Sequence, residues 1–153
     1  MKIADILTPE RVVLDAALET KQAVLETLAA LLAQAHPALN EGAILESLLA
    51  RERLGTTGLG AGIAIPHGRA AQAAGAIGAF LRTRRPVAYS AIDKAPVDLF
   101  FALCVPAAAV AEHLALLAEL AQLFNAPRLV QALRHTATAP ETYALLIAPA
   151  SVA

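Results

Sequence analysis

The segment that most constrains the fold is residues 99–105, in which every residue is apolar. A strand with one face in water alternates apolar and polar residues, whereas a continuously apolar strand is buried on both faces. Asp98 precedes this run and Pro106 ends it. The pattern therefore predicts that Val97–Val105 is a central strand of its sheet.

Two amphipathic helices are predicted in the first half of the chain. Residues 21–35 place leucines at helical spacing behind Thr20, a suitable N-cap, and Pro37 ends the pattern. Residues 41–54 repeat it, and Gly55 follows where a helix often ends in glycine.

The second half combines further strands with helices. We expect strands at 75–83 and 87–89, followed by three helices. The first helix carries an apolar stripe formed by Leu114, Leu117, Leu120, Ala121 and Phe124. The second runs from Pro127 to about Arg134, and the last covers 141–147 behind Pro140. No linker or repeat divides the chain. Residues 1–153 are therefore predicted to form a single α/β (α+β) domain, a mixed β-sheet covered by helices.

Composition and charge exclude several classes of function. The net charge is −1 and the Lys and Arg residues are scattered, so we expect no nucleic acid as a partner. Cys104 is the one cysteine and belongs to no metal-ligand motif, which fits a reducing cytoplasm. Acidic residues interrupt the region where a signal peptide would be apolar, and the most apolar window, 99–111, is shorter than the about 20 residues of a membrane span. We expect a cytoplasmic protein that is not membrane-embedded and has no cofactor.

The stretch between the two halves carries the candidate chemistry. Glycines interrupt residues 55–68, where we expect a tight loop, a short strand at 63–65 and a turn at Pro66-His67-Gly68 that pushes the imidazole out of the fold. Gly68 leaves room beside the ring for a phosphorylated side chain of a partner. A neutral imidazole is nucleophilic at cytoplasmic pH. On these features alone, a phosphoryl acceptor and an ordinary turn histidine are equally favoured.

Other catalytic classes fit poorly. The glycine-rich loop lacks the Lys-Ser/Thr ending of a P-loop and follows a helix, so ATP binding is not expected. The histidines and the cysteine lack zinc-ligand spacing, and the sequence contains no nucleophile-elbow serine.

Residues 51–69 closely resemble the active-site signature of the fructose/mannitol and nitrogen-regulatory enzyme IIA family of the bacterial phosphotransferase system. Residues 91–106 resemble the central strand segment of that family, and Glu112-His113-Leu114 resembles its second histidine site. The resemblance implies the fructose/mannitol-type enzyme IIA fold. It also implies that His67 accepts the phosphoryl group, that His113 stabilises it and that Arg51 contacts it. Ala61 departs from the family pattern, in which an acidic or amide residue is common.

The resemblance also suggests site residues in the glycine-rich loop, but it supports their roles less strongly. Thr56, Thr57, Gly62 and Gly68 are candidate site residues, although hydroxyls that bond only the local backbone are an equally good reading of the two threonines.

The resemblance also implies partners. The donor is expected to be a phosphocarrier protein of the HPr type, so the surface around His67 should be shallow and partly apolar. The sequence resembles the nitrogen-regulatory group most, which signals by phosphorylation-dependent binding to regulatory target proteins. The alternatives are a sugar-specific enzyme IIA that passes the group to a IIB partner, and a non-catalytic protein-binding module on the same fold.

Overall fold

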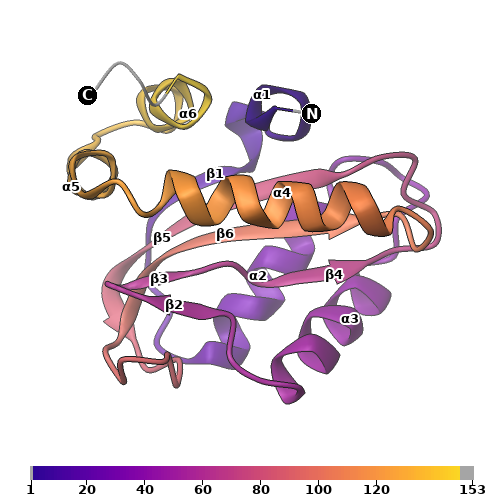
Figure 1. The fold of residues 1–153 in the computed structure, drawn as a ribbon, viewed down its shortest axis with the longest axis horizontal. Helices are drawn as coiled ribbons and strands as arrows, with labels where there is room; N and C mark the ends of the chain where they lie inside the picture. The colour runs from indigo at the N-terminus through magenta and orange to yellow at the C-terminus, as the bar shows by residue number, and fades with distance from the viewer. Residues whose placement is uncertain (1, 149–153) are drawn as a thin grey trace.

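The computed structural model describes residues 2–148, which form a sheet between two layers of helices (Figure 1). The helices are α1 (Ile3–Ile6), the 3-10 turn η1 (Pro9–Arg11), α2 (Lys21–Ala33), α3 (Glu41–Arg53), α4 (Val110–Leu123), α5 (Pro127–His135) and α6 (Ala139–Ile147). The strands are β1 (Val12–Ala16), β2 (Gly58–Gly60), β3 (Ile63–Ala64), β4 (His67–Arg69), β5 (Ile77–Val87) and β6 (Val97–Val105). No helix within the described residues is long and apolar enough to cross a membrane.

The sheet is mixed, and β6 lies at its centre as predicted. The strand order is β1-β5-β6-β3-β2, with β4 following β3 along the same edge of β6. β5 runs antiparallel to β6, whereas β3 and β4 run parallel to it. The register places His67 opposite Leu103, so the pairing of β4 with β6 fixes the backbone at the candidate site.

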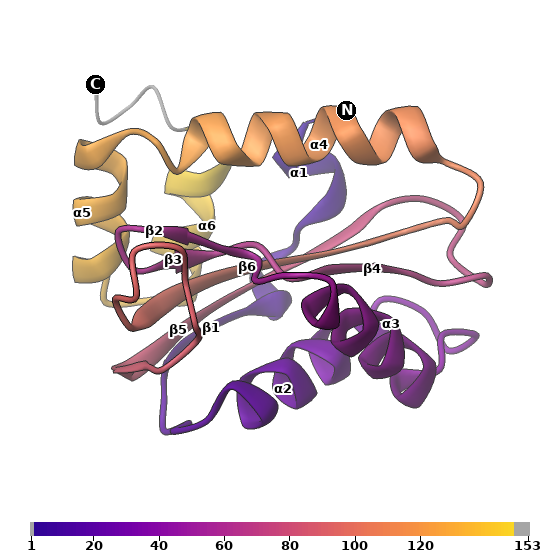
Figure 2. The same cartoon turned by 60° about the horizontal axis from the view of Figure 1, so that its bottom comes forward.

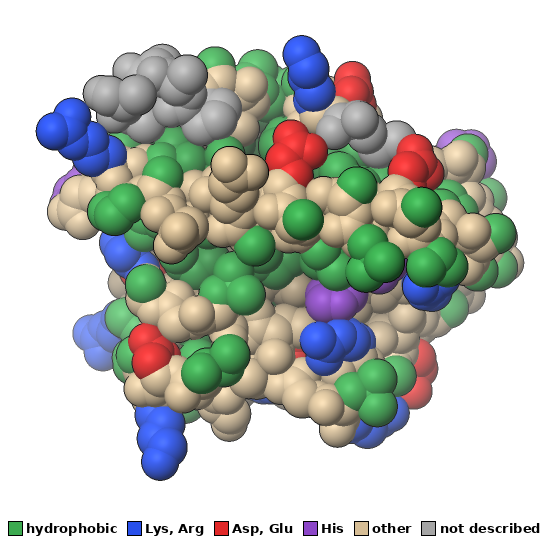
Figure 3. Space-filling model, in the orientation of Figure 1, with side chains coloured by type: hydrophobic (Ala, Val, Ile, Leu, Met, Phe, Trp, Pro, Cys, Tyr) green, Lys and Arg blue, Asp and Glu red, His purple; other side chains and the backbone are tan. Residues whose placement is uncertain are grey.

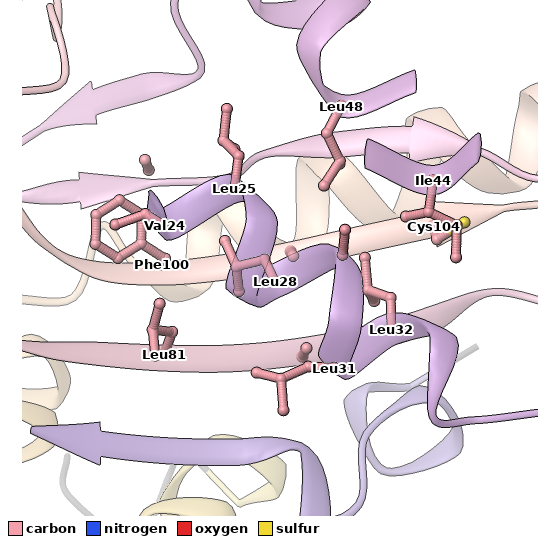
Figure 4. Packing of buried hydrophobic residues seen from close by; sticks show 14 of the residues in the cluster. Val24, Leu25, Leu28, Leu31, Leu32, Ile44, Leu48, Leu81, Phe100 and Cys104 are labelled. Carbon is pink, nitrogen blue, oxygen red and sulfur yellow. The ribbon is translucent and has the colours of Figure 1, made fainter. Parts of the chain in front are cut away.

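The continuous apolarity of β6 follows from the two cores that it separates. Side chains of a strand alternate between faces. Phe100, Ala102 and Cys104 pack into the core under α2 and α3, whereas Leu99, Phe101, Leu103 and Val105 pack into the core under α1, α4, α5 and α6. Figure 2 shows these helix layers on opposite faces of the sheet. Figure 4 shows the leucines of α2 lying over Leu81 and Phe100.

Side-chain caps explain where several helices begin. The hydroxyl of Thr20 accepts the Ala23 amide at 3.1 Å, which confirms the predicted cap of α2. Asn40 caps α3 through the Ala43 amide at 2.9 Å, and Thr138 caps α6. Each such cap is worth about 1 kcal/mol.

The structure corrects the prediction of strands at 75–83 and 87–89. A single strand, β5, covers residues 77–83 of the first range and only Val87 of the second, so Tyr89 lies outside it. The pairing of β5 with β6 is irregular between Arg82 and Val87, which leaves Pro86 at a place where no ladder hydrogen bond is required of it.

The turn predicted at residues 66–68 is also wrong. The Pro66 carbonyl accepts the Leu103 amide at 3.0 Å, so the chain continues along β6 and His67 begins β4.

Candidate functional site

His67 lies at the start of β4 with both ring nitrogens engaged. Nδ1 lies 2.9 Å from the carbonyl oxygen of Ile65, and because a carbonyl only accepts, Nδ1 is the nitrogen that carries the proton. Arg51 donates its Nε–H to His67 Nε2 at 3.1 Å, so Nε2 carries no proton and its lone pair accepts this hydrogen bond. The two contacts together select one neutral tautomer, with Nε2 as the nucleophilic nitrogen.

His67 is only 9% exposed, so the expectation that a turn pushes its ring out of the fold is wrong. Burial lowers the pKa of His67 below its usual value, and the nearby Arg51 lowers it further, while the Ile65 carbonyl and Glu52 oppose the shift. The ring is therefore neutral at neutral pH, as a nucleophile must be.

His113 lies in the first turns of α4 and faces His67. The ring centroids are 5.1 Å apart and the rings are nearly perpendicular, so one phosphoryl group could contact both residues. Burial is the main cause that lowers the pKa of His113, followed by His67, Arg69 and Arg51. Its Nδ1 is buried without a hydrogen-bond partner among the described residues, and leaving a buried polar atom unpaired costs about 1–3 kcal/mol.

Arg51 comes from the last turn of α3, on the opposite side of the ring from the Ile65 carbonyl. Its Nη1 donates to the Gly55 carbonyl at 2.8 Å, which holds the guanidinium in place. α3 can approach β4 this closely because Gly68 has no side chain: a Cβ there would lie 2.7 Å from the Ser47 hydroxyl.

These residues line a groove of ≈ 600 Å³ between α3 and α4. Figure 3 shows a histidine surface there, with hydrophobic side chains of α4 on one side and basic side chains nearby. Leu54, Val110 and Leu114 on the rim are 84%, 51% and 63% exposed. The rim is partly apolar, as expected, and the two histidines that line the groove are buried, with His67 9% and His113 7% exposed.

The family is decided by residues 5–148, which match the phosphoenolpyruvate-dependent sugar phosphotransferase system EIIA 2 family. The chain belongs to this enzyme IIA family. A nitrogen regulatory protein of Pseudomonas aeruginosa is 41% identical over 147 residues, which cover 96% of each chain. One from Bradyrhizobium diazoefficiens is 38% identical over 153 residues, covering 100% of this chain and 99% of the relative. The resemblance to the nitrogen-regulatory group is thereby confirmed.

Solved structures agree with this enzyme IIA assignment. The crystal structure of nitrogen regulatory protein IIA-Ntr from Neisseria meningitidis superposes with a TM-score of 0.88 at 42% identity, covering 94% of this chain and 98% of that one. The IIA mannitol protein of Escherichia coli has a TM-score of 0.76 at 22% identity, over 92% and 98% of the chains, and shows the fold alone. The predicted enzyme IIA fold is confirmed.

The remaining loop candidates lie away from the groove of this enzyme IIA. Thr56 accepts the Gly58 amide at 3.0 Å, and Thr57 is buried against Glu52 and Tyr89. Gly62 adopts a φ of 81°, and a Cβ there would lie 2.4 Å from Arg134 Nη2. The structure thus gives these three residues local backbone and packing contacts.

Arg69 lines the groove but was not among the sequence candidates. It donates from Nη1 to the Ala107 carbonyl, in the loop that leads into α4. Residues two apart on a strand share a face, so recognising 67–69 as a strand would have placed Arg69 beside His67.

Proposed function

We propose that this enzyme IIA is a phosphoryl carrier that takes a phosphoryl group onto Nε2 of His67 from a phosphocarrier protein of the HPr type. The observation that carries the proposal is the contact between His67 Nδ1 and the Ile65 carbonyl, which assigns the proton to Nδ1. Nε2 is then unprotonated, and its lone pair can exchange the hydrogen bond from Arg51 for a bond to phosphorus. As the bond from Nε2 to phosphorus forms, the bond from phosphorus to the donor's nitrogen breaks, and the donor nitrogen keeps that electron pair. No cofactor or metal takes part in this step.

Arg51 and His113 compensate the charge that arrives. A phosphoryl group brings about −1.5 to −2 charges at neutral pH. Arg51 Nε loses its acceptor when Nε2 bonds phosphorus, and its donors then turn to the phosphoryl oxygens. The buried Nδ1 of His113, which has no partner among the described residues, gains one in the same oxygens. Arg69 adds a second guanidinium to the groove.

The groove suits a protein donor. Exposed Leu54, Val110 and Leu114 surround the histidines with apolar surface that a folded partner can cover. Arg51 and Arg69 also line the groove, where they attract the donor's phosphoryl group.

The downstream role is proposed as nitrogen-regulatory signalling, in which target proteins distinguish the phosphorylated from the free form. The relatives named nitrogen regulatory proteins support it. Transfer to a IIB partner is the second candidate. It is favoured by a PTS system fructose-specific EIIA component of Haloferax volcanii, 35% identical over 125 residues, and by a solved complex of enzyme IIA mannitol with phosphorylated enzyme IIB mannitol from Escherichia coli.

The test is incubation with enzyme I, the phosphocarrier protein and phosphoenolpyruvate, followed by mass spectrometry and ³¹P NMR. Wild type should gain one phosphoryl group, bonded to Nε2, and His67→Ala should gain none. His135→Ala is a matched control, because that histidine ends α5 and bonds the Gln131 carbonyl of its own helix, and the variant should be labelled normally. An adduct on Nδ1, or labelling of His67→Ala, would refute the assignment, and an unlabelled wild type would favour the binding-module alternative.

A further inference from the structure

A buried carboxylate lies directly beside the groove without lining it. The side chain of Glu52, which follows Arg51 in α3, is 6% exposed. Its Oε1 accepts the Thr57 amide at 3.2 Å and pairs with Lys21 Nζ at 2.8 Å. Its Oε2 accepts the hydroxyls of Thr57 and Tyr89. The carboxylate thus joins the loop after α3, through Thr57, to Lys21 at the start of α2 and to Tyr89 beyond β5.

Burying the Glu52 carboxylate costs free energy, so its hydrogen-bond network calls for a structural or functional explanation. Burying a carboxylate forfeits its hydration, and a buried ion pair is by itself weak evidence for added stability. Tyr89 is enclosed with it: burial, and then the negative charge of Glu52, raise the pKa of the phenol. The ammonium of Lys21 also lies 4.3 Å from the centre of the Tyr89 ring. Such closed networks hold backbone in one arrangement, and here that backbone belongs to Thr57.

Two further hydrogen bonds connect Thr57 to the His67 ring. The Thr57 carbonyl accepts the Ile65 amide at 3.0 Å. The carbonyl of the same residue, Ile65, accepts the proton on His67 Nδ1 at 2.9 Å. The path from Glu52 therefore reaches the contact that selects the His67 tautomer.

The same loop also holds the other contact of the ring. Arg51, which donates to Nε2, is tied through Nη1 to the Gly55 carbonyl, and the Gly55 amide donates to the Glu52 carbonyl at 3.1 Å. Both partners of the His67 ring are thus attached to the segment that the Glu52 side chain anchors.

We propose that Glu52 is a positioning residue for phosphoryl transfer: its carboxylate holds Thr57, and through it the Ile65 carbonyl, where that carbonyl keeps the proton on Nδ1 of His67 and leaves Nε2 unprotonated and able to bond to phosphorus. The inference rests on the proposed function in taking phosphoryl transfer as the reaction. The tautomer itself is a property of the free protein and is measured without any donor.

The experiment compares Glu52→Gln with wild type in two measurements. In ¹⁵N NMR of the free protein, wild type should show His67 protonated on Nδ1, and the variant should show a mixture of both tautomers. In single-turnover transfer from the phosphocarrier, the maximal rate should fall about tenfold, as expected for losing one well-made hydrogen bond to a charged group. The donor concentration at half-maximal rate should stay the same, because Glu52 does not line the groove.

Thr142→Val is the matched control. That hydroxyl is fully buried in the other core and bonds Thr136 at 2.6 Å, so its loss should lower stability without changing the tautomer or the rate. If Glu52→Gln does not fold, Thr57→Val, which removes one contact of the carboxylate, should shift the tautomer in the same direction.

The outcomes separate the two proposals. A folded Glu52→Gln with the wild-type tautomer and rate overturns the positioning role, as does an unchanged tautomer in Thr57→Val when Glu52→Gln fails to fold. A wild type that carries the Nδ1–H tautomer but accepts no phosphoryl group refutes the proposed function, while the tautomer shift in the variant still supports the positioning of the ring.

Discussion

Replacing His113 by leucine should slow phosphoryl transfer without weakening the fold. The substitution removes both ring nitrogens and keeps an apolar side chain against the His67 ring. His113 would donate one hydrogen bond to the phosphoryl group, and such a charge-assisted bond is worth about 1.5–3 kcal/mol, or roughly ten- to a hundredfold in rate. His67 and its tautomer remain, so the phosphorylated protein should still form.

The same substitution, His113→Leu, should raise the stability of the folded protein although it slows phosphoryl transfer. His113 Nδ1 is buried and has no partner within residues 2–148, a cost of about 1–3 kcal/mol that leucine does not carry. Leucine does not reproduce the shape of the planar imidazole, so poorer packing against the His67 ring offsets part of this gain in stability. We expect the free energy of unfolding to rise by about 1 kcal/mol and Tm by about 2–4 °C.

Rapid-quench transfer from the phosphocarrier and thermal unfolding measure the two effects. His113→Gln is the companion variant, because its amide keeps a donor and should recover part of the lost rate. A His113→Leu protein that accepts phosphoryl groups at the wild-type rate, or that unfolds more than about 1 kcal/mol more easily, would refute this reasoning about the unpaired nitrogen.

Three further predictions concern stability and geometry. Burial lowers the pKa of both His67 and His113 in the folded protein, so on acidification the unfolded chain binds protons at a higher pH than the folded protein does. The free energy of unfolding should therefore fall as the pH drops below about 6.5, the pKa of a histidine in the unfolded chain. The loss should level off once the pH is below the pKa values of the folded protein. Ala61→Gly should raise Tm by about 2–4 °C, because Ala61 has a φ of 56°, which glycine adopts without strain. Gly68→Ala should cost about 1–3 kcal/mol in the free energy of unfolding and slow transfer, because a Cβ there pushes α3, with Arg51, away from His67.

Each of these has a matched comparison. The pH dependence is measured by thermal unfolding of wild type and of a variant with both histidines replaced, whose curve should be flatter; equal slopes would contradict the assignment. Ala118→Gly makes the same chemical change in an exposed, regular part of α4 and should lower Tm, so equal shifts for the two glycine variants would count against strain at Ala61. For Gly68→Ala, adding Ser47→Gly removes the clashing side chain and should restore part of the stability; no recovery would contradict the steric explanation.

The sequence predicts the long elements because their signals are local. The apolar run of β6, the leucine spacing of α2 and the prolines at the starts of α5 and α6 each follow from rules that act within a few residues. Their ends agree with the structure to within a residue or two, as at α2, which ends at Ala33.

The short strands could not be predicted because they depend on pairing with other strands and not on local sequence signals. β2 consists of Gly58-Leu59-Gly60, which has low strand propensity and exists because it pairs with β3. β4 is held by its parallel pairing with β6, a contact between residues far apart in the chain. The orientation of His67 depends on that same pairing, so the sequence indicates which histidine is the candidate acceptor but not how its ring is held.

The His67 site forms only when both helix layers are packed on the sheet. Arg51 arrives from the layer under the sheet and His113 from the layer above it, while His67 lies on β4 at the edge between them (Figure 2). A fragment that keeps the Ile-Pro-His-Gly motif but lacks either layer loses one of the two neighbours of the ring. The proposed reactivity of His67 therefore requires two separate cores to be folded at once. Grafting the motif onto another loop would transfer the histidine without the contacts that select its tautomer, without Arg51 and without His113.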